Sequence, residues 1–353
     1  MKTPKETGYV MPAEWEHHSA TQLHWPSNFE TWPGERLKRV EQVYVEIIYA
    51  LHRYEPVLLF LDPTTHYRTI ENMLLNAGVN PANIYIYQVP INDVWARDCG
   101  PIYIQNKVTN RFAITDWEYN AWGEKYPPFD SDNALPGWFA DTFDLLHLKP
   151  GIVLEGGSID TNGKGVILTT ESVLLNKNRN SHLNKSEIEG YLSEYLGAEK
   201  IIWLKNGLAG DDTDGHIDDL SRFLNRNTIL TMITEDPDDI NYRALQENHQ
   251  ILSEAKNLDG EPFNIVTLPL PKTKIEGTTV DGSEFVPASY ANFYIANGVV
   301  LLPLYDERYD QLAVETFKKY FSDRDIVGIP CADLVWGQGS IHCITQQLYG
   351  LNL

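Results

Sequence analysis

The sequence predicts an α/β fold in which five similar modules are arranged around a common axis. Three observations predict it: five segments with helical periodicity, a short apolar run after each of them, and hairpin-like stretches between these units. A helix followed by a buried strand, repeated several times, is typical of an array of one structural unit. The pattern also leaves open an ordinary α/β sheet with an irregular strand order.

The five helical segments carry apolar residues three and four positions apart, which predicts one buried face on each helix. Each segment is followed within a few residues by an apolar run of strand length. The helical segments are residues 34–54, 67–78, 184–197, 240–256 and 309–321, and the runs after them are residues 56–61, 83–89, 200–204, 264–270 and 325–329.

Four stretches with Asn or Gly at a turn predict antiparallel hairpins: residues 101–117, 158–170, 220–232 and 292–305. A fifth hairpin needs one strand from TQLHWP at 21–26 and one from IHCITQQ at 341–347. Such closure by the chain ends predicts a single domain, residues 1–353, of ββαβ modules whose inner strands face a central cavity. Residues 120–147, which carry two adjacent prolines, are predicted to form a long loop with one short helix.

Charge and composition restrict the partners. The chain has 28 Lys plus Arg against 49 Asp plus Glu, a net charge of −21, which argues against a nucleic-acid partner and is compatible with a cationic substrate. The most apolar runs are too short to span a bilayer, and no signal-peptide-like segment is present, so we expect a cytoplasmic protein with no membrane partner. The three cysteines show no CxxC spacing. The sequence leaves open whether the chain forms a homo-oligomer.

The stretch WGQGSIHCITQQ places His342 and Cys343 side by side. The apolar run behind its glycine-rich turn is predicted to be a strand, where successive side chains point to opposite faces, so the two would not form a pair. A nucleophilic Cys343 therefore needs a base from elsewhere in the chain. The candidate base is His216 in AGDDTDGHIDDLSRF, which on a strand would share a face with Asp218.

Two further motifs place polar groups where a glycine-rich turn meets a strand. VWARDCGP offers Trp95 and Asp98, and VLEGGSID offers Glu155, although each acid alone also fits a turn or cap. Two aspartates could hold a planar guanidinium by charge-assisted hydrogen bonds while a thiolate attacks its central carbon. A free thiol with a pKa of about 8.5 is only slightly ionised at pH 7. Activation therefore needs a positive charge, from the bound cation or from protonated His216.

At these motifs the sequence resembles the agmatine deiminase family, also known as the bacterial-type peptidylarginine deiminase-like family of the pentein guanidine-modifying superfamily. The resemblance extends from MPAEWEHHSATQLHWP through VWARDCGP, LEGGSID and GDDTDGHIDD to GSIHCITQQ, in the family's order and over nearly the whole chain. It implies a five-bladed α/β propeller. It also implies a hydrolase that converts agmatine to N-carbamoylputrescine and ammonia in putrescine and polyamine biosynthesis, with no cofactor and no metal.

The resemblance also assigns roles to residues. The nucleophile falls on Cys343, the general acid and base on His216, and the carboxylates that grip the guanidinium on Asp98 and Asp218. Glu155 matches the acid that supports the histidine. The implied reaction is thiolate attack on the guanidinium carbon, loss of ammonia protonated by His216, and attack of a His216-activated water on the amidino-thioether.

The same resemblance places an aromatic wall at Trp95 and an acid near the substrate's distal amine at Asp212. Between residues 119 and 140 the only basic side chain is Lys125, among several acids. An acidic mouth favours a substrate with a second positive charge and no carboxylate. The stretch 120–140 is shorter and richer in proline than the loop expected of the family, which bears on the contacts to the distal amine.

Other functions stay open at the level of sequence. They are deimination of peptidyl arginine, amidino transfer to a second amine through the same covalent intermediate, and a propeller of this type that only binds. A divalent ion held for hydrolysis by His216, Asp218, Asp98 and Glu155 is a further alternative.

Overall fold

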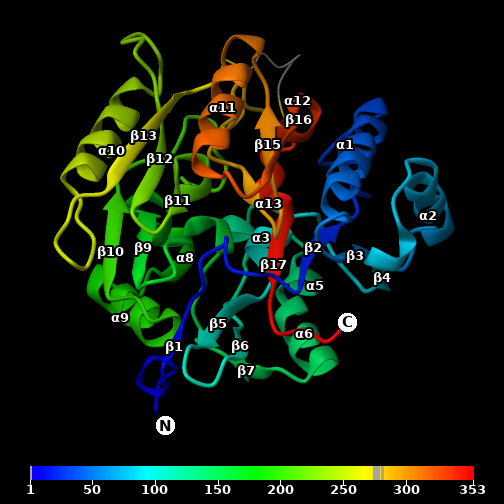
Figure 1. Ribbon diagram of the computed structural model, residues 1–353, viewed down its shortest axis with the longest axis horizontal. Coiled ribbons are helices and arrows are strands. Elements are labelled where there is room, and N and C mark those ends of the chain that lie inside the picture. The colour runs from blue at the N-terminus through cyan, green and yellow to red at the C-terminus, as the bar shows by residue number, and fades with distance from the viewer. Residues whose placement is uncertain (1, 273–278, 280–281) are drawn as a thin grey trace.

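The strands of the computed structural model form five separate sheets, and the structure describes residues 2–272, 279 and 282–353 (Figure 1). Each sheet contains an antiparallel pair followed, through a helix, by a third strand parallel to its neighbour. The antiparallel pairs are β17 (Thr345–Leu348) with β2 (Ala20–His24), β5 (Ile102–Asn106) with β6 (Arg111–Thr115), β8 (Asp160–Thr161) with β9 (Val166–Thr170), β11 (Ser221–Asn225) with β12 (Thr228–Ile233), and β14 (Tyr294–Ile295) with β15 (Val299–Leu304).

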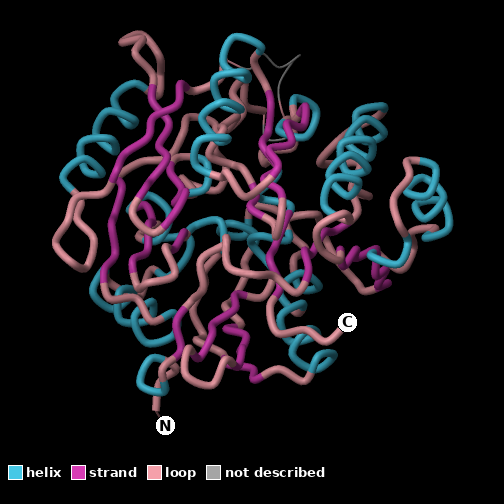
Figure 2. Tube along the Cα trace, viewed as in Figure 1, coloured by secondary structure: helices cyan, strands magenta, loops and turns pink. Residues whose placement is uncertain are grey.

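The parallel third strands complete the repeating unit. They are β3 (Val57–Leu61), β7 (Leu146–Leu148), β10 (Lys200–Leu204), β13 (Asn264–Pro269) and β16 (Asp325–Pro330). The helices that lead into them are α1 (Glu35–Leu51), α6 (Leu135–Phe143), α9 (Lys185–Leu196), α10 (Tyr242–Glu254) and α11 (Glu307–Tyr320). Figure 2, in the same view as Figure 1, shows α10 at the periphery, with β13 and β12 between it and the middle of the molecule.

The remaining elements are short or lie at sheet edges. Helix α2 (Tyr67–Asn76) leads to β4 (Ile84–Gln88), which extends the first sheet, and β1 (Tyr9–Val10) extends the second. Single turns are α4 (Ala121–Glu124), α5 (Asp130–Asn133), α7 (Glu171–Leu174), α8 (Lys177–Asn180), α12 (Ala332–Val335), η1 (Lys5–Thr7) and η2 (Pro81–Asn83). None of the helices in the described residues has the length and apolar character to cross a membrane.

Local sequence explains where these helices form. In α1 the buried side chains Leu37, Val40, Tyr44 and Leu51 recur at intervals of three, four and seven, so one face meets the core. Helix α9 begins with a capping box in which the side chains of N-cap Asn184 and of Glu187 each bond the other's backbone N–H, a motif that stabilises a helix by about 1 kcal/mol.

Both ends of the chain meet in one sheet, as the sequence predicted. Strands β2 and β17 pair antiparallel, with Thr345 opposite Leu23 and Leu348 opposite Ala20. The fifth antiparallel pair is therefore made by segments more than three hundred residues apart. This pairing places the end of the WGQGSIHCITQQ motif beside β2.

One part of the predicted repeat was wrong. The sequence predicts separate units for residues 34–61 and 67–89, but β3 and β4 lie in one sheet. The unit that was missing, α6 followed by β7, spans residues 135–148 and so falls almost entirely in the stretch 120–147, which was predicted to be a long loop with one short helix. The prolines and glycines of this stretch obscured a nine-residue helix that has Pro136 within its first turn, where proline is tolerated.

Candidate active site

Cys343 lies in a single helical turn, α13 (Ile341–Ile344), and not in a strand as the sequence predicted. Strand β17 begins only at Thr345. The Ile and Thr residues favour a strand, but tertiary contacts override this preference, because Asn292 Oδ1 accepts hydrogen bonds from the backbone N–H groups of His342 at 2.9 Å and Cys343 at 3.4 Å. A turn presents successive N–H groups to one acceptor, whereas in a strand they point in opposite directions.

His342 and Cys343 are nevertheless not a nucleophile and base pair. His342 Nδ1 lies 2.7 Å from Asp218 Oδ2, and its Nε2 lies 2.8 Å from Glu14 Oε2. Cys343 Sγ lies 3.9 Å from the same Asp218 oxygen and 3.2 Å from Asn292 Nδ2. Sequence reasoning singled out neither Asn292 nor Glu14.

Asp98 lies in the turn α3 (Ala96–Cys99), where two donors hold its carboxylate. Trp122 Nε1 donates to Oδ2 at 3.0 Å, and the backbone N–H of Gly157 donates to Oδ1 at 2.9 Å. Burial, and then the charge of Glu155, raises the pKa of Asp98 to about 7 in spite of these donors. Trp122 was not predicted from the sequence as a site residue. A buried carboxylate needs a hydrogen-bond donor, and the stretch NAWGEK offers one in the indole N–H of Trp122.

Gly157, in η3 (Gly156–Ser158), marks the point where three predicted residues converge. A Cβ at this position would lie 2.6 Å from His216 Nδ1, 2.7 Å from Asp98 Oδ1 and 3.1 Å from Asp218 Oδ2. His216 Nδ1 itself lies 3.7 Å from Asp98 Oδ1 and 4.0 Å from Asp218 Oδ1. A glycine is needed here because any larger side chain would fill the space among these polar atoms.

His216 and Asp218 converge without the predicted strand. His216 is the N-cap of η4 (Ile217–Asp219), and the strand β11 starts only at Ser221. Gly215 before it has a positive φ of 110°, a conformation that glycine readily adopts. The strand prediction was wrong because this acidic and glycine-rich stretch forms tight turns, which a pattern of two-residue spacing does not reveal.

Glu155 precedes η3 and is buried beside a cation. Arg179, from α8, donates from Nε to Glu155 Oε1 and also from Nη1 to Asp214 Oδ2 at 2.8 Å. Sequence reasoning missed Arg179. Three buried site atoms, Glu155 Oε2, His216 Nε2 and Asp218 Oδ1, have no hydrogen-bond partner among the described residues. Unsatisfied buried polar atoms are rare, and a functional site is one place where they are expected.

The protonation states of the empty site follow from burial. Burial, with the charges of Asp218, Asp219 and Asp98, raises the pKa of the Cys343 thiol well above its ordinary value. Burial, with the charge of Arg179, lowers the pKa of His216 well below its ordinary value. The thiol is therefore protonated and the imidazole neutral before a ligand arrives, so protonated His216 does not supply the positive charge that activation of the thiol needs.

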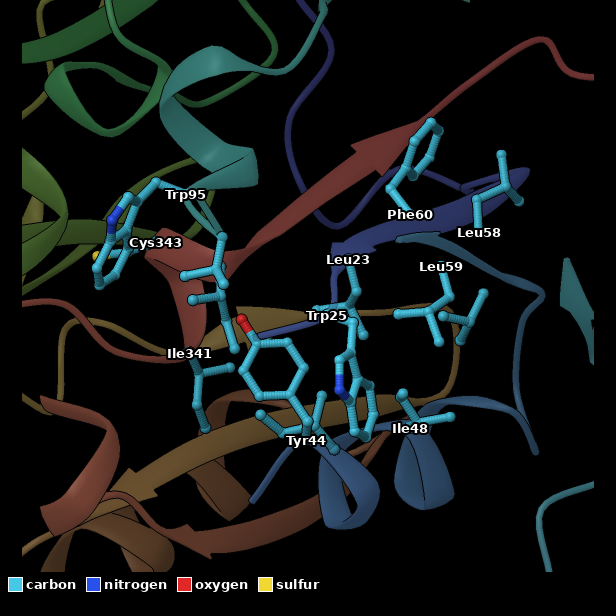
Figure 3. Close-up of a cluster of buried hydrophobic side chains, with 14 of the residues drawn as sticks. Leu23, Trp25, Tyr44, Ile48, Leu58, Leu59, Phe60, Trp95, Ile341 and Cys343 are labelled. Atoms are coloured by element: carbon cyan, nitrogen blue, oxygen red, sulfur yellow. The ribbon is translucent and has the colours of Figure 1, made fainter. Parts of the chain in front are cut away.

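A pocket of about 570 Å³ opens onto this group of residues and is lined by Cys343, Asp98 and Trp95, whereas His216 and Asp218 do not belong to its described lining. Trp95 packs edge-on against Trp122, with ring centroids 6.2 Å apart. Figure 3 shows Trp95 and Cys343 at one end of the buried hydrophobic cluster to which both belong. The predicted aromatic wall is thus adjacent to the thiol.

The pocket is strongly acidic. Among the described lining residues, Lys125 is the only basic side chain, and it forms an ion pair with Asp214 at 2.8 Å. Asp212 lines the pocket and accepts a hydrogen bond from Tyr126 Oη at 2.7 Å. The lining carboxylates are Glu30, Asp62, Asp93, Asp98, Asp132 and Asp212. Such a lining attracts cations and repels carboxylates.

The alternative set of metal ligands fits this geometry poorly. Glu155 already binds the guanidinium of Arg179, and this fixed cation opposes a second one beside it. Within the described residues, the groups of three whose ligand atoms lie close together are Asp218, Asp219 and Cys343, and His24, Cys99 and Asp132.

The chain is similar to known proteins over nearly its whole length. The sequence matches the family described as Porphyromonas-type peptidyl-arginine deiminase over residues 10–348. A Legionella pneumophila relative, provisionally named an agmatine deiminase, is 39% identical over 345 residues, which cover 98% of this chain and 96% of the relative. The solved structure of an Enterococcus faecalis agmatine deiminase has a TM-score of 0.90 and 32% identity, and covers 99% of this chain and 98% of that one. A substrate-bound Cys→Ser variant of C. jejuni agmatine deiminase has a TM-score of 0.85 and 32% identity, with 97% of each chain covered.

The fold and the site therefore define a mixed α/β protein in which a buried cysteine, a histidine and paired aspartates meet at an acidic pocket. The chain belongs to the Porphyromonas-type peptidyl-arginine deiminase family. The family resemblance predicted from the sequence is confirmed.

Proposed function

We propose that the protein is a hydrolase that deiminates agmatine, giving N-carbamoylputrescine and ammonia, and so supplies putrescine and polyamine biosynthesis. The observation that carries the proposal is the pocket, in which a cysteine, an aspartate and a tryptophan stand together in a strongly acidic lining. Agmatine carries a guanidinium and a distant amine, and it has no carboxylate that this lining would repel. The names of the Enterococcus and C. jejuni structures support this substrate.

Asp98 and Asp218 hold the guanidinium in this proposal. Each carboxylate can accept charge-assisted hydrogen bonds from the planar fork of N–H donors. The unsatisfied Asp218 Oδ1 gains a partner when a ligand with several N–H groups binds. Trp95 forms a flat wall for the guanidinium, and Asp212 receives the distal amine.

The bound cation then activates the nucleophile. A positive charge next to Cys343 offsets the effect of the three surrounding aspartates and lowers the pKa of the thiol, whose proton passes to His216. The thiolate attacks the guanidinium carbon. His216 returns the proton to the departing nitrogen, and ammonia leaves the amidino-thioether.

A water molecule completes the reaction. His216 takes one proton from this water as it attacks the amidino carbon. The second proton of the water passes to sulfur as the C–S bond breaks and the carbonyl forms, so the urea product leaves, the Cys343 thiol is restored and His216 loses its proton to solvent. Glu155 supports the charge on the histidine, with Arg179 fixing the position of the carboxylate. The chain's own residues supply every group in this scheme, and no cofactor or metal takes part.

The remaining parts of the proposal concern the whole chain. The five units of antiparallel pair, helix and parallel strand support a five-bladed α/β propeller of the pentein type, formed by residues 1–353 as one catalytic domain. Free thiols at Cys99, Cys331 and Cys343 are compatible with the reducing cytoplasm. We expect a small cationic guanidine as the partner and leave a homo-oligomer as an open outcome.

A second candidate is deimination of arginine within a peptide, which the description of the matching family favours. The discriminating experiment measures ammonia release by chelator-treated protein with agmatine, free arginine and a blocked arginine peptide, each beside Cys343→Ser. Turnover of agmatine alone, lost in the variant, is the expected result. Turnover of the peptide alone would replace the proposed substrate, and no turnover of any of the three would overturn the proposal.

A further inference from the structure

Three buried titratable side chains form a chain of contacts that leads away from the pocket. His342 lies between two carboxylates, with Nδ1 at 2.7 Å from Asp218 Oδ2 and Nε2 at 2.8 Å from Glu14 Oε2. All three side chains are buried. Each contact must contain a proton, because a carboxylate oxygen and an unprotonated ring nitrogen are both acceptors and would repel at these distances. The chain of contacts therefore holds two protons.

The outer proton belongs to His342, because Glu14 is held in its charged form. Glu14 Oε2 also lies 3.0 Å from Arg222 Nη2 and 3.3 Å from Arg97 Nη2, and Oε1 accepts from the backbone N–H of Ile295 at 2.8 Å. Burial opposes ionisation of Glu14, but the charge of Arg222, the hydrogen bond from His342 and the charge of Arg97 outweigh it and keep its pKa well below its ordinary value. The Nε2–H bond of His342 is thus fixed.

The inner proton lies between Asp218 Oδ2 and His342 Nδ1 and can reside on either atom. Which atom holds it depends on whether a cation is bound in the pocket. Burial and the charge of Asp98 raise the pKa of Asp218 well above its ordinary value, and burial with Arg222 and Arg97 lowers that of His342. In the empty site this proton therefore lies on Asp218. A cation that binds beside Asp218 favours the carboxylate, and the proton then has to move only from Oδ2 to Nδ1.

We propose that His342 is a positioning residue that takes up, on Nδ1, the proton that Asp218 gives up when a guanidinium binds. The Asp218 O–H bond breaks and the His342 Nδ1–H bond forms, so the summed charge of the pair is unchanged. The inference rests on the proposed function, in which Asp218 contacts the guanidinium. The pocket then exchanges no proton with solvent at Asp218 when it accepts the cation.

The surroundings of the pair explain why the imidazole is needed. The charged and titratable groups that face it are Glu14 from the N-terminal loop, Arg97 and Asp98 from α3, Asp211 from the loop before η4, Asp219 from η4, Arg222 from β11 and Cys343 from α13. The acids among them are ionised or themselves raised in pKa, and the arginines cannot accept a proton. His216 also faces the pair, but its Nδ1 lies 4.0 Å from Asp218 Oδ1, beyond hydrogen-bond distance, and in the proposed mechanism this imidazole takes the thiol proton. Without His342, Asp218 therefore gives up its proton to solvent.

The substitution His342→Gln tests this difference. It keeps a side chain able to hydrogen-bond Asp218 but removes the proton acceptor. The proton on Asp218 then competes with the cation, so the Kd for agmatine should rise about tenfold for each pH unit below the pKa of Asp218. With His342 present, this component of the pH dependence should be absent.

The direct measurement is the number of protons released when agmatine binds, from calorimetry at pH 7 in buffers that differ in ionisation enthalpy. Cys343→Ser serves as the background, because it prevents turnover and removes the thiol proton from the count. We expect His342→Gln to release about one proton more per agmatine than the background does. The matched control is His18→Gln, since His18 is also buried, contacts the Glu14 backbone and pairs with Glu55.

A second measurement detects the proton on His342 directly, so that the test does not depend only on the folding of His342→Gln. In the Cys343→Ser protein labelled with ¹⁵N-histidine, agmatine should convert one neutral imidazole to imidazolium, at a resonance that His342→Gln removes. Equal proton release with and without His342, or an imidazole that stays neutral, would overturn the inference while agmatine still binds. If agmatine fails to bind to either protein, the proposed function and this inference both fall.

Discussion

Asp98→Asn is predicted to make the protein more stable at pH 8 and less stable at pH 4. The pKa of Asp98 rises from an ordinary value of 3.8 to about 7, so the folded protein retains a proton that the unfolded chain releases. Stability is therefore lost as the pH rises from about 4 to 7. At about 1.4 kcal/mol for each pH unit, the accumulated loss is about 4 kcal/mol.

Asparagine avoids this loss but introduces a smaller one. Its amide nitrogen must face either Trp122 Nε1–H or the Gly157 N–H, so one donor loses its acceptor at a cost of about 1–3 kcal/mol. The net gain at pH 8 is about 1–3 kcal/mol, and near pH 4 only the cost remains.

The assay is urea unfolding of both proteins at several values between pH 4 and 8, with the slope of each transition compared. We expect the free energy of unfolding of Asp98→Asn to be lower than that of the unsubstituted protein at pH 4 and higher at pH 8. If Asp98→Asn is destabilised by the same amount at pH 4 and pH 8, Asp98 is not held at a raised pKa and this account of the empty site is wrong.

The other predictions concern single contacts. Trp122→Phe removes the donor to Asp98 and should reduce kcat/KM for agmatine by about tenfold, whereas an unchanged value would show that the indole N–H is dispensable. Gly157→Ala places a methyl group 2.6 Å from His216 Nδ1 and should lower kcat by about 100-fold with a native circular dichroism spectrum; normal kcat would contradict the convergence of the site on this glycine. EDTA should leave the rate unchanged, and inhibition reversed by zinc would favour the metal alternative.

Much of the fold could be predicted because it rests on periodicity. The amphipathic pattern of residues 34–54 and 184–197 placed α1 and α9 correctly, and the need for a fifth hairpin predicted the pairing of β2 with β17. The sequence predicts one short helix within residues 120–147 but does not locate α6, because its three- and four-residue spacing is interrupted by Pro136 and Gly137. Periodicity also could not assign β3 and β4 to one sheet, since pairing is a tertiary property.

The site was predicted by residue type more reliably than by local geometry. Asp98, His216 and Asp218 do converge, and Cys343 lies 3.9 Å from Asp218, although turns rather than strands bring them there. The supporting residues were harder to find. Arg179 is far in sequence from Glu155, and its role becomes visible only once the fold brings the two side chains together.

The central claim is that Cys343 forms a covalent amidino-thioether during turnover. The most direct test is to mix the protein with agmatine, quench with acid within the first turnovers, and locate any adduct by mass spectrometry of the digested chain. The account predicts an amidino adduct on the peptide that contains Cys343, absent from Cys343→Ser, with ammonia release lost in the same variant. Steady ammonia release from agmatine with Cys343 unmodified, or from Cys343→Ser at the normal rate, would contradict it.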